Sequence, residues 1–150
     1  MNQDVVSLNG KGEIAEIGGK ARNLMDLLAA GFPVPEGLVV CTAAYERFLD
    51  RDGLRARIGE ALTALDYGDA LKVARCAESI RGWVMAQSID PDLEALLQRE
   101  MNGPGPEGLW AVRSAAIAED LEKASFAGQQ DTFLNVSRGK VAVQVKKCWA

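Results

Sequence analysis

Apolar residues recur at intervals of three and four along six stretches of the chain, which is the spacing of one face of an α-helix. The first stretch follows Gly18-Gly19 and ends at Gly31, and Thr42 and Asp90 are N-cap candidates for the second and fifth. The six apolar stripes are Ala21, Leu24, Met25 and Leu28; Tyr45, Phe48 and Leu49; Leu54, Ile58, Leu62 and Leu65; Val73, Ala77, Ile80 and Val84; Leu93, Leu96, Leu97 and Met101; and Val141, Val145, Cys148 and Trp149. The pattern predicts six helices.

Four shorter segments have the composition of β-strands. Residues 5–8 and 38–41 are short apolar runs, residues 109–114 follow a loop rich in Gly and Pro, and residues 131–136 alternate apolar and polar side chains. Residues 115–130 are mostly small and polar, without a clear period. So few strands cannot close a barrel or form a large sheet. We therefore predict a helix-rich α/β (α+β) fold, and the length of 150 residues predicts one domain.

Composition and charge narrow the classes of function. The chain is 48% hydrophobic and 25% charged, as is ordinary for a globular protein. Its net charge is −4 and its 17 Lys and Arg residues are scattered, which argues against a general nucleic-acid binder. No apolar run approaches the ~18 residues of a membrane helix, so no membrane partner is expected. The N-terminal residues lack the apolar core of a secretory signal, and the expected location is the cytoplasm.

Cysteine and histidine usage limits the available chemistry. Cys41, Cys76 and Cys148 are far apart and form no C-x-x-C pair, so we expect buried, reduced thiols rather than a zinc or redox site. The chain contains no histidine, which removes the commonest general base, metal ligand and phosphoryl carrier. Any chemistry must use Lys, Arg, carboxylates, hydroxyls and backbone groups, or depend on residues outside this sequence.

The first candidate site is Gly18-Gly19-Lys20, directly before the first predicted helix. Glycines at this position leave the first N–H groups of the helix accessible, and the helix dipole adds partial positive charge there. Lys20 adds a full cation. The segment is suited to phosphate, although a Gly-Gly-Lys turn before a helix is common and is not a Walker A loop. An ordinary turn with a solvated lysine is the alternative.

The second candidate runs from the strand at 109–114 to the strand at 131–136. Arg113 leaves an apolar strand, and an arginine there should face an anion or a cleft, because it is costly to bury unpaired. The small-residue loop after it could offer backbone N–H groups to phosphate oxygens, and Thr132 could add a hydroxyl. The alternative is a surface loop in which Arg113 pairs with Glu119 or Asp120.

Taken together, these segments resemble the N-terminal nucleotide-binding domain of the family that contains phosphoenolpyruvate synthase, pyruvate phosphate dikinase and rifampicin phosphotransferase. The resemblance covers most of the chain and is weakest from Leu54 to Met101. It is carried by Gly18-Gly19-Lys20, by Gly31-Phe32-Pro33-Val34-Pro35-Glu36-Gly37, by Ala111-Val112-Arg113-Ser114, by Glu119-Asp120-Leu121, by the run from Ala124 to Val136, and by Lys146-Lys147-Cys148-Trp149-Ala150. The Ser-Phe-Ala-Gly-Gln-Gln run beginning at Ser125 is its most specific part.

The resemblance implies a role for individual residues. Lys20 and Arg113 would be the cations on the ATP phosphates, Gly128 would donate its backbone N–H in the loop over them, and Thr132 would contact the nucleotide beside it. Ala115 stands where a second serine is usual, and Glu122-Lys123 replaces a usual proline-containing pair. The first departure could weaken a phosphate contact and the second could loosen the loop.

The resemblance also implies a fold and cofactors. It implies a partial ATP-grasp-like lobe in which residues 1–150 are the N-terminal part of a longer ATP-binding domain. ATP and Mg²⁺ would be the cofactors. The Mg²⁺ ligands, much of the adenine pocket, the second lobe and the phosphohistidine domain are expected outside these 150 residues.

Three functions follow as expectations. The first is the ATP-binding portion of a phosphoenolpyruvate synthase-like phosphotransferase, which moves phosphoryl groups from ATP to a carrier histidine and then to pyruvate, and which is inactive as this fragment alone. The second is an antibiotic-modifying rifampicin phosphotransferase, and the third is a non-catalytic nucleotide-binding module. The last predicted helix has no stop signal and carries Trp149 on its apolar face, so we expect truncation and an exposed apolar patch there. Either self-association or partial disorder of the last turn should follow.

Overall fold

The computed structural model describes residues 4–10, 14–101, 108–115 and 131–150. Its helices and strands are β1 (Val5–Ser7), α1 (Ile14–Ile17), α2 (Gly19–Ala29), β2 (Leu38–Val40), α3 (Thr42–Asp50), α4 (Leu54–Thr63), α5 (Ala70–Ala86), α6 (Pro91–Glu100), β3 (Leu109–Arg113), β4 (Thr132–Ser137) and α7 (Val141–Trp149), with short 3-10 turns η1 (Arg51–Gly53) and η4 (Arg138–Lys140). The six predicted helices and four predicted strands are all present, with shifted ends. The single-turn helix α1 was not predicted, because four residues show no helical period.

The two predicted N-cap residues, Asp90 and Thr42, have different outcomes in the structure. Asp90 caps α6 as predicted: its side chain accepts a hydrogen bond from the backbone N–H of Asp92 at 3.0 Å, and Pro91 occupies the first turn. The prediction for Thr42 was wrong. Thr42 is the first residue of α3 and makes no cap; its hydroxyl donates instead to the carbonyl oxygen of Glu16 at 3.1 Å. That bond ties α3 to α1.

The strands form two small antiparallel sheets. β1 pairs with β2, and β3 pairs with β4. In the second sheet Leu109 lies opposite Ser137 and Arg113 opposite Thr132, with a shift in register between Trp110 and Val112. The predicted mixture of helices and few strands is therefore confirmed, whereas an ATP-grasp arrangement stays a prediction.

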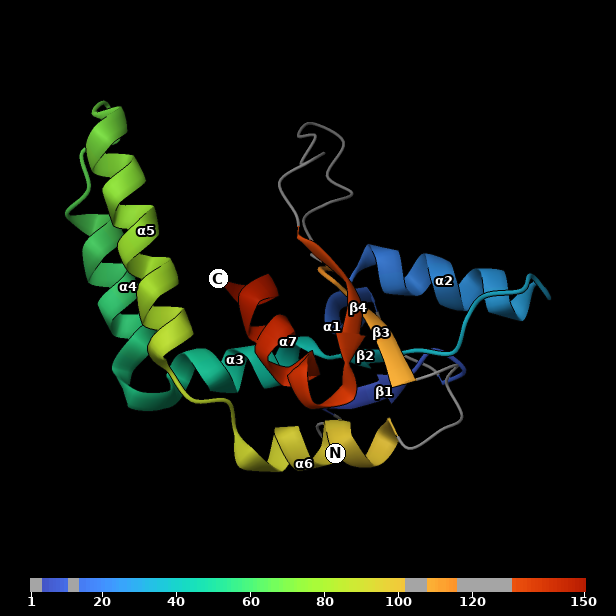
Figure 1. Cartoon of the computed structure of the whole chain (residues 1–150). Helices are drawn as coiled ribbons and strands as arrows, with labels where there is room; N and C mark the ends of the chain where they lie inside the picture. The colour runs from blue at the N-terminus through green and yellow to red at the C-terminus, as the bar shows by residue number, and fades with distance from the viewer. Residues whose placement is uncertain (1–3, 11–13, 102–107, 116–130) are drawn as a thin grey trace.

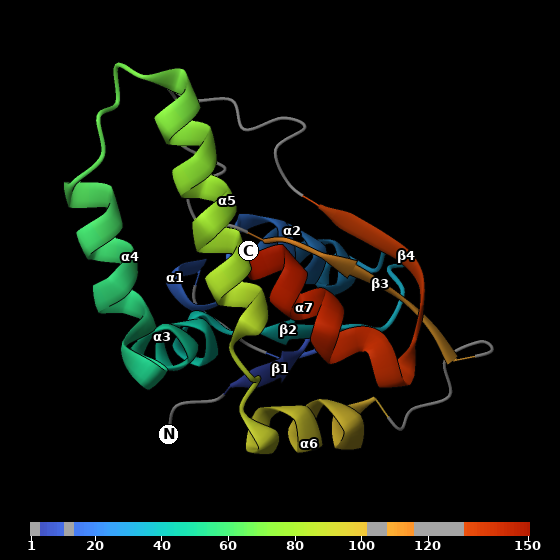
Figure 2. The same ribbon diagram turned by 60° about the vertical axis from the view of Figure 1, so that its left-hand side comes forward.

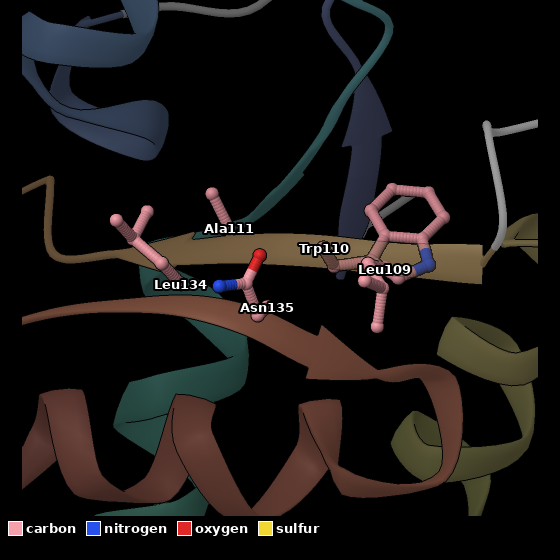
Figure 3. A pocket seen from close by; sticks show the side chains of 5 residues that line it. All are labelled: Leu109, Trp110, Ala111, Leu134 and Asn135. Carbon is pink, nitrogen blue, oxygen red and sulfur yellow. The ribbon is translucent and has the colours of Figure 1, made fainter.

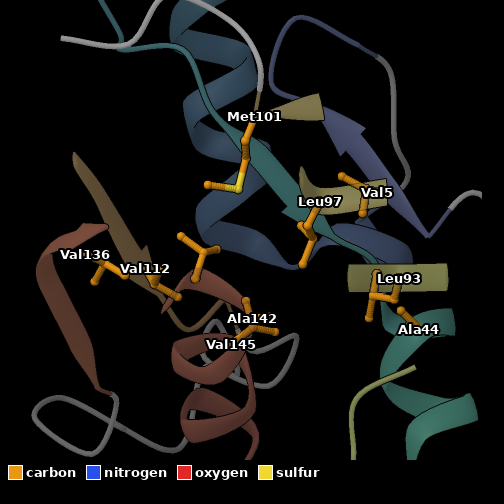
Figure 4. Packing of buried hydrophobic residues seen from close by; sticks show 10 residues of the cluster. Val5, Ala44, Leu93, Leu97, Met101, Val112, Val136, Ala142 and Val145 are labelled. Atoms are coloured by element: carbon orange, nitrogen blue, oxygen red, sulfur yellow. The ribbon is translucent and has the colours of Figure 1, made fainter. Parts of the chain in front are cut away.

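The largest hydrophobic core joins both sheets to three helices (Figure 4). Its buried members come from β1, α3, α6, β3, β4 and α7 and are Val5, Ala44, Leu93, Leu97, Met101, Val112, Val136, Val141, Ala142 and Val145. A second cluster packs α1 and α2 against β1 and β2, with Ile17, Ala21 and Met25 on the helical side. The second cluster thus fixes the N-terminal end of α2 relative to the first sheet.

Helices α4 and α5 form an antiparallel hairpin that projects from the rest of the molecule (Figures 1 and 2). Its base is packed against α3 through a third cluster made of Phe48, Leu49, Leu54 and Val84. Its far end is exposed: Tyr67 retains 68% and Leu71 70% of its surface accessibility. Arg57 lies over the Trp83 ring at 3.9 Å from its centroid and holds the two helices together.

The apolar face of the last helix is packed, which corrects one expectation. Val145 is buried in the main core, and Trp149 lies half-buried between α3 and α5. The ring centroid of Trp149 is 5.5 Å from that of Tyr45 and 5.0 Å from that of Phe48. The expectation of an open apolar patch on this face was wrong, because α3 and α5 supply the partners that the local pattern could not reveal.

Two further expectations from the sequence were buried, reduced cysteines and the absence of a membrane-spanning helix. Cys41 is buried, as predicted, whereas Cys76 and Cys148 are half-buried, and all three are free thiols. In the described ranges no helix has both the length and the apolar character needed to span a bilayer.

Candidate nucleotide site

The start of α2 requires glycine for two separate reasons. Gly18 has φ 77° and ψ 161°, a region of backbone conformation that is essentially closed to residues with a side chain. A Cβ atom on Gly18 would also lie 2.9 Å from the carbonyl carbon of Ala115 and closer still to its oxygen. The chain just after β3 therefore presses directly on the residue that precedes α2.

That contact brings together the two segments selected from the sequence. Lys20 is the second residue of α2, two positions after Gly18, and its side chain is exposed. Arg113 is the last residue of β3, two positions before Ala115, and it is exposed as well. The first intrahelical hydrogen bond of α2 runs from the Arg22 N–H to the Gly18 carbonyl at 3.1 Å, so the N–H groups of residues 19–21 precede the helical ladder.

Thr132 lies beside Arg113. The two residues are direct partners across β3 and β4, and both side chains are exposed. Their neighbours Val112 and Phe133 face the other way, toward the core and α7. Arg113 and Thr132 therefore share the outer face of the ribbon, in line with the strand period of two.

Two expectations for the loop after β3 concern residues outside the described ranges. Gly128 lies outside the described residues, and so do Glu119 and Asp120, the alternative partners of Arg113. Within the described residues Arg113 has no acidic partner closer than 4.0 Å. The Ser114 N–H donates to the carbonyl of Asp131 at 3.4 Å, which closes the two strands at the base of that loop.

The C-terminal turn of α7 reaches the same end of the ribbon. The Lys147 ammonium lies 5.5 Å from the centroid of the Phe133 ring. Lys147 thus adds a cation near Arg113 and Thr132, on the opposite face of the ribbon. The pair Lys146-Lys147 in the sequence was the only signal for this third cation.

The neighbouring thiol is half-buried. Burial, with a smaller contribution from the negative charge of Asp131, raises the pKa of the Cys148 thiol to about 11.

The outer face also carries a shallow pocket that sequence reasoning missed (Figure 3). It is lined by Leu109, Trp110, Ala111, Leu134 and Asn135. In the close-up the Asn135 side chain points from β4 toward β3 and lies beside Leu134. The sequence did contain a signal for this pocket. Leu134 is two residues from Thr132 in a strand whose other face is buried, so both side chains should lie on the outer face. An exposed leucine could therefore have been predicted there.

The described part of the chain holds no group of three or more His, Cys, Asp or Glu residues placed to bind a metal ion. The residues that the sequence selects for the candidate site offer cations, a hydroxyl and a backbone amide, which suit an anion and not a cation. They do not fit Mg²⁺, and we attribute no chemical step to it.

Comparison with known proteins gives one family. Residues 14–150 match the model of the pyruvate phosphate dikinase AMP/ATP-binding domain. The chain is 40% identical over 148 residues to a probable phosphoenolpyruvate synthase of Staphylothermus marinus, covering 93% of this chain and 18% of that protein. It is 35% identical over 149 residues to the phosphoenolpyruvate synthase of Escherichia coli K12, covering 94% and 19%.

Relatives with another name match at a similar level. The chain is 37% identical over 142 residues to a rifampicin phosphotransferase of Bacillus cereus, covering 93% of this chain and 16% of that protein. The chain therefore spans about a fifth or less of the length of these relatives.

Proposed function

Since the chain belongs to the family of the pyruvate phosphate dikinase AMP/ATP-binding domain, we propose that it supplies the phosphate-binding cations of a phosphoenolpyruvate synthase-like phosphotransferase. In this proposal residues 1–150 form the N-terminal lobe of an ATP-grasp-like unit, and Lys20, Arg113, Gly128 and Thr132 contact ATP. The complete enzyme transfers phosphoryl groups from ATP to a carrier histidine and then to pyruvate.

One observation carries the assignment of the site. The close approach of Gly18 to Ala115 puts the N-terminal end of α2 against the end of β3, so Lys20 and Arg113 are each two residues from a shared contact. Two cations carried by adjoining segments favour a bound anion over a neutral ligand. A polyphosphate is such an anion, and the positive end of the α2 dipole adds to the attraction.

The role of these residues is electrostatic. A phosphoryl group in transfer carries its charge on its equatorial oxygens, so an enzyme gains most by positioning it and by neutralising that charge. Lys20 and Arg113 would neutralise it, the Gly128 N–H would hold the group under the loop, and the Thr132 hydroxyl would orient the nucleotide. Mg²⁺, with ligands from outside these residues, would be bound by the nucleotide.

We further propose that the 150-residue chain binds nucleotide without phosphorylating pyruvate. The chain has no histidine to carry a phosphoryl group. A coupled assay with ATP and pyruvate should give no turnover above a blank without protein. Turnover that persists after contaminating enzymes are excluded would contradict this part of the proposal.

A rifampicin phosphotransferase is the second candidate, because identity to the Bacillus cereus relative is 37%, close to the values for the synthases. The two differ in acceptor and share the ATP half-reaction. We expect a cytoplasmic location for either. Self-association stays a prediction, although the apolar face of α7 that motivated it is packed against α3 and α5.

The test is nucleotide binding by isothermal titration. Lys20→Ala and Arg113→Ala should each weaken ATP binding by about 1–3 kcal/mol, as expected for charge-assisted hydrogen bonds. Arg75→Ala removes an exposed cation from α5 and is the matched control, with no expected effect. Equal affinities for all four proteins would refute the proposed site.

A further inference from the structure

The one-turn helix α1 lies directly before the Lys20 end of the candidate site. It ends at Ile17, and Gly18 and Lys20 follow one and three residues later. In both views of the molecule α1 lies between α2 and α3 (Figures 1 and 2). Because so few residues separate α1 from α2, any rotation or displacement of α1 moves the start of α2 as well. The position of Lys20 therefore depends on what holds α1.

Apolar contacts hold α1 in place without orienting it. Ile17 is 3% exposed and packs in the second cluster together with Ala21 of α2. Burial of apolar surface has no preferred direction, so it leaves the rotation of a single turn poorly determined. A turn of four residues also contains too few hydrogen bonds of its own to be stable by itself. A directional contact from another element is needed to orient it.

The Thr42 hydroxyl supplies this directional contact. It donates to the backbone carbonyl oxygen of Glu16 at 3.1 Å and joins two residues that are 26 positions apart in the chain. The last carbonyl groups of a helix have no partner within that helix, so the bond satisfies a group at the end of α1. Glu16 is two residues before Gly18 and four before Lys20. The bond thus acts on the backbone immediately before the candidate site.

Thr42 is itself firmly placed. The Cys41 N–H donates to the carbonyl oxygen of Asp4 at 2.8 Å, and Cys41 is 4% exposed. Ala44, two residues after Thr42, is buried in the main core. The hydroxyl therefore projects from a segment that is fixed on both sides. The bond to Glu16 lies at the surface, where water can replace it, so its loss should cost little overall stability.

We propose that Thr42 is a positioning residue for the candidate phosphate site. Through the Glu16 carbonyl it orients α1, and α1 in turn holds Lys20 beside the end of β3. Thr42 itself does not touch the ligand. This inference rests on the proposed function, since it requires that Lys20 bind phosphate. The competing explanation is that the hydroxyl only stabilises the fold, and the experiment separates the two.

The experiment measures binding of ATP and of inorganic tripolyphosphate to the 150-residue protein. Thr42→Val has nearly the same shape and lacks the hydroxyl, so both affinities should fall about five- to tenfold, while the melting temperature falls by only about 2–4 °C. Thr42→Ser retains a hydroxyl and should restore both affinities. Thr63→Val is the matched control: the Thr63 hydroxyl donates to the Gly59 carbonyl oxygen at 2.8 Å within α4, and its loss should change neither affinity.

A double-mutant cycle tests whether Thr42 acts through Lys20. In the Lys20→Ala background, Thr42→Val should lower tripolyphosphate affinity by less than about twofold, because the cation that it positions is gone. A loss of stability alone would have the same effect in both backgrounds. Without ligand, amide hydrogen exchange of residues 17–21 should speed up in Thr42→Val and remain unchanged in Thr63→Val.

Several outcomes would overturn the inference and leave the phosphate site in place. They are unchanged affinities in Thr42→Val, an equal loss in Thr42→Ser, and equal losses with and without Lys20. If neither Thr42→Val nor Thr42→Ala folds, the inference is also wrong, because the hydroxyl then serves the whole fold. A wild type that binds neither ligand, or a Lys20→Ala protein that binds as tightly as the wild type, would overturn the proposed function instead.

Discussion

The α4–α5 hairpin and the junction between α2 and the β3–β4 ribbon are built on opposite principles. The hairpin is made of neighbours in sequence, and its caps are local: Asp69 accepts hydrogen bonds from the N–H groups of Leu71 and Lys72 at 3.0 and 3.2 Å. A Cβ atom added at Gly59 or Gly82 would meet nothing within 4 Å apart from the neighbouring backbone of its own helix. The junction joins residues almost a hundred positions apart, and Gly18 has no room for a single added carbon.

The two regions should therefore differ in how well they tolerate substitutions. The hairpin should tolerate most surface substitutions, since its far end is exposed and the spacing of its own apolar residues is enough to specify its two helices. The junction holds the candidate cations and is fixed by close backbone approach and by a backbone conformation that only glycine adopts readily. Features of that kind persist where the surrounding structure requires them, and they cluster at binding sites. The junction should therefore be the less tolerant of the two regions.

The largest expected effect is at the glycines. Gly18→Val should lower the free energy of unfolding by about 3 kcal/mol or more, because it adds a disfavoured backbone conformation to a collision with Ala115. Gly59→Ala in α4 should raise it by about 0.5–1 kcal/mol, because alanine is the better helix former and the site has space. Urea unfolding of both variants gives the two values. Similarly small changes in the free energy of unfolding at Gly18 and Gly59 would contradict the expected difference between the junction and the hairpin.

Aromatic packing should give the next largest effect. Trp149→Ala should lower the free energy of unfolding by about 2–3 kcal/mol, since the ring contacts Tyr45 and Phe48 and is half-buried. Tyr67→Ala, at the exposed end of the hairpin, should change it by less than about 0.5 kcal/mol. Thermal unfolding monitored by circular dichroism measures both. A neutral Trp149→Ala would mean that α7 does not dock on α3 in solution.

A smaller effect is expected where the hairpin meets the rest of the molecule. The Lys146 ammonium donates to the carbonyl oxygens of Met85 at 2.8 Å and Gln87 at 2.9 Å, at the C-terminal end of α5. Lys146→Met keeps most of the apolar stem and should lower the free energy of unfolding by about 1–2 kcal/mol. Hydrogen exchange should speed up in residues 83–90 more than elsewhere. Lys140→Met, at an exposed lysine, is the control and should leave both quantities unchanged.

The effect that is smallest at neutral pH concerns the Cys148 thiol. Burial raises the pKa of Cys148 from 9.0 to about 11, so between these values the thiol ionises in the unfolded chain before it ionises in the folded one. The associated stability is complete below pH 9.0 and is lost as the pH rises toward 11. At pH 8 the folded thiol should react with a disulfide reagent at least about tenfold more slowly than in urea. Equal rates in Cys41→Ser, Cys76→Ser protein, which retains Cys148 alone, would contradict this.

Local patterns predicted the elements of both regions well. The stripe from Leu54 to Leu65 predicted α4, and Asp90 before Pro91 predicted the start of α6, because capping and helical period act between residues close in sequence. The same reasoning failed at Thr42, whose hydroxyl found a tertiary partner in Glu16. It also failed for α1, which is too short to show a period.

For the candidate site, the sequence predicted which residues take part but did not predict how they are arranged in space. The sequence by itself determined the helices, the strands, the glycines at the start of α2 and the candidate cations Lys20 and Arg113. Only the tertiary structure decided that Gly18 meets Ala115, that the register of β3 and β4 shifts between Trp110 and Val112, and that Trp149 packs against Tyr45 and Phe48. The physical reason is range: backbone propensity and capping depend on neighbours in the chain, whereas packing and close approach depend on which distant surfaces the hydrophobic core brings into contact.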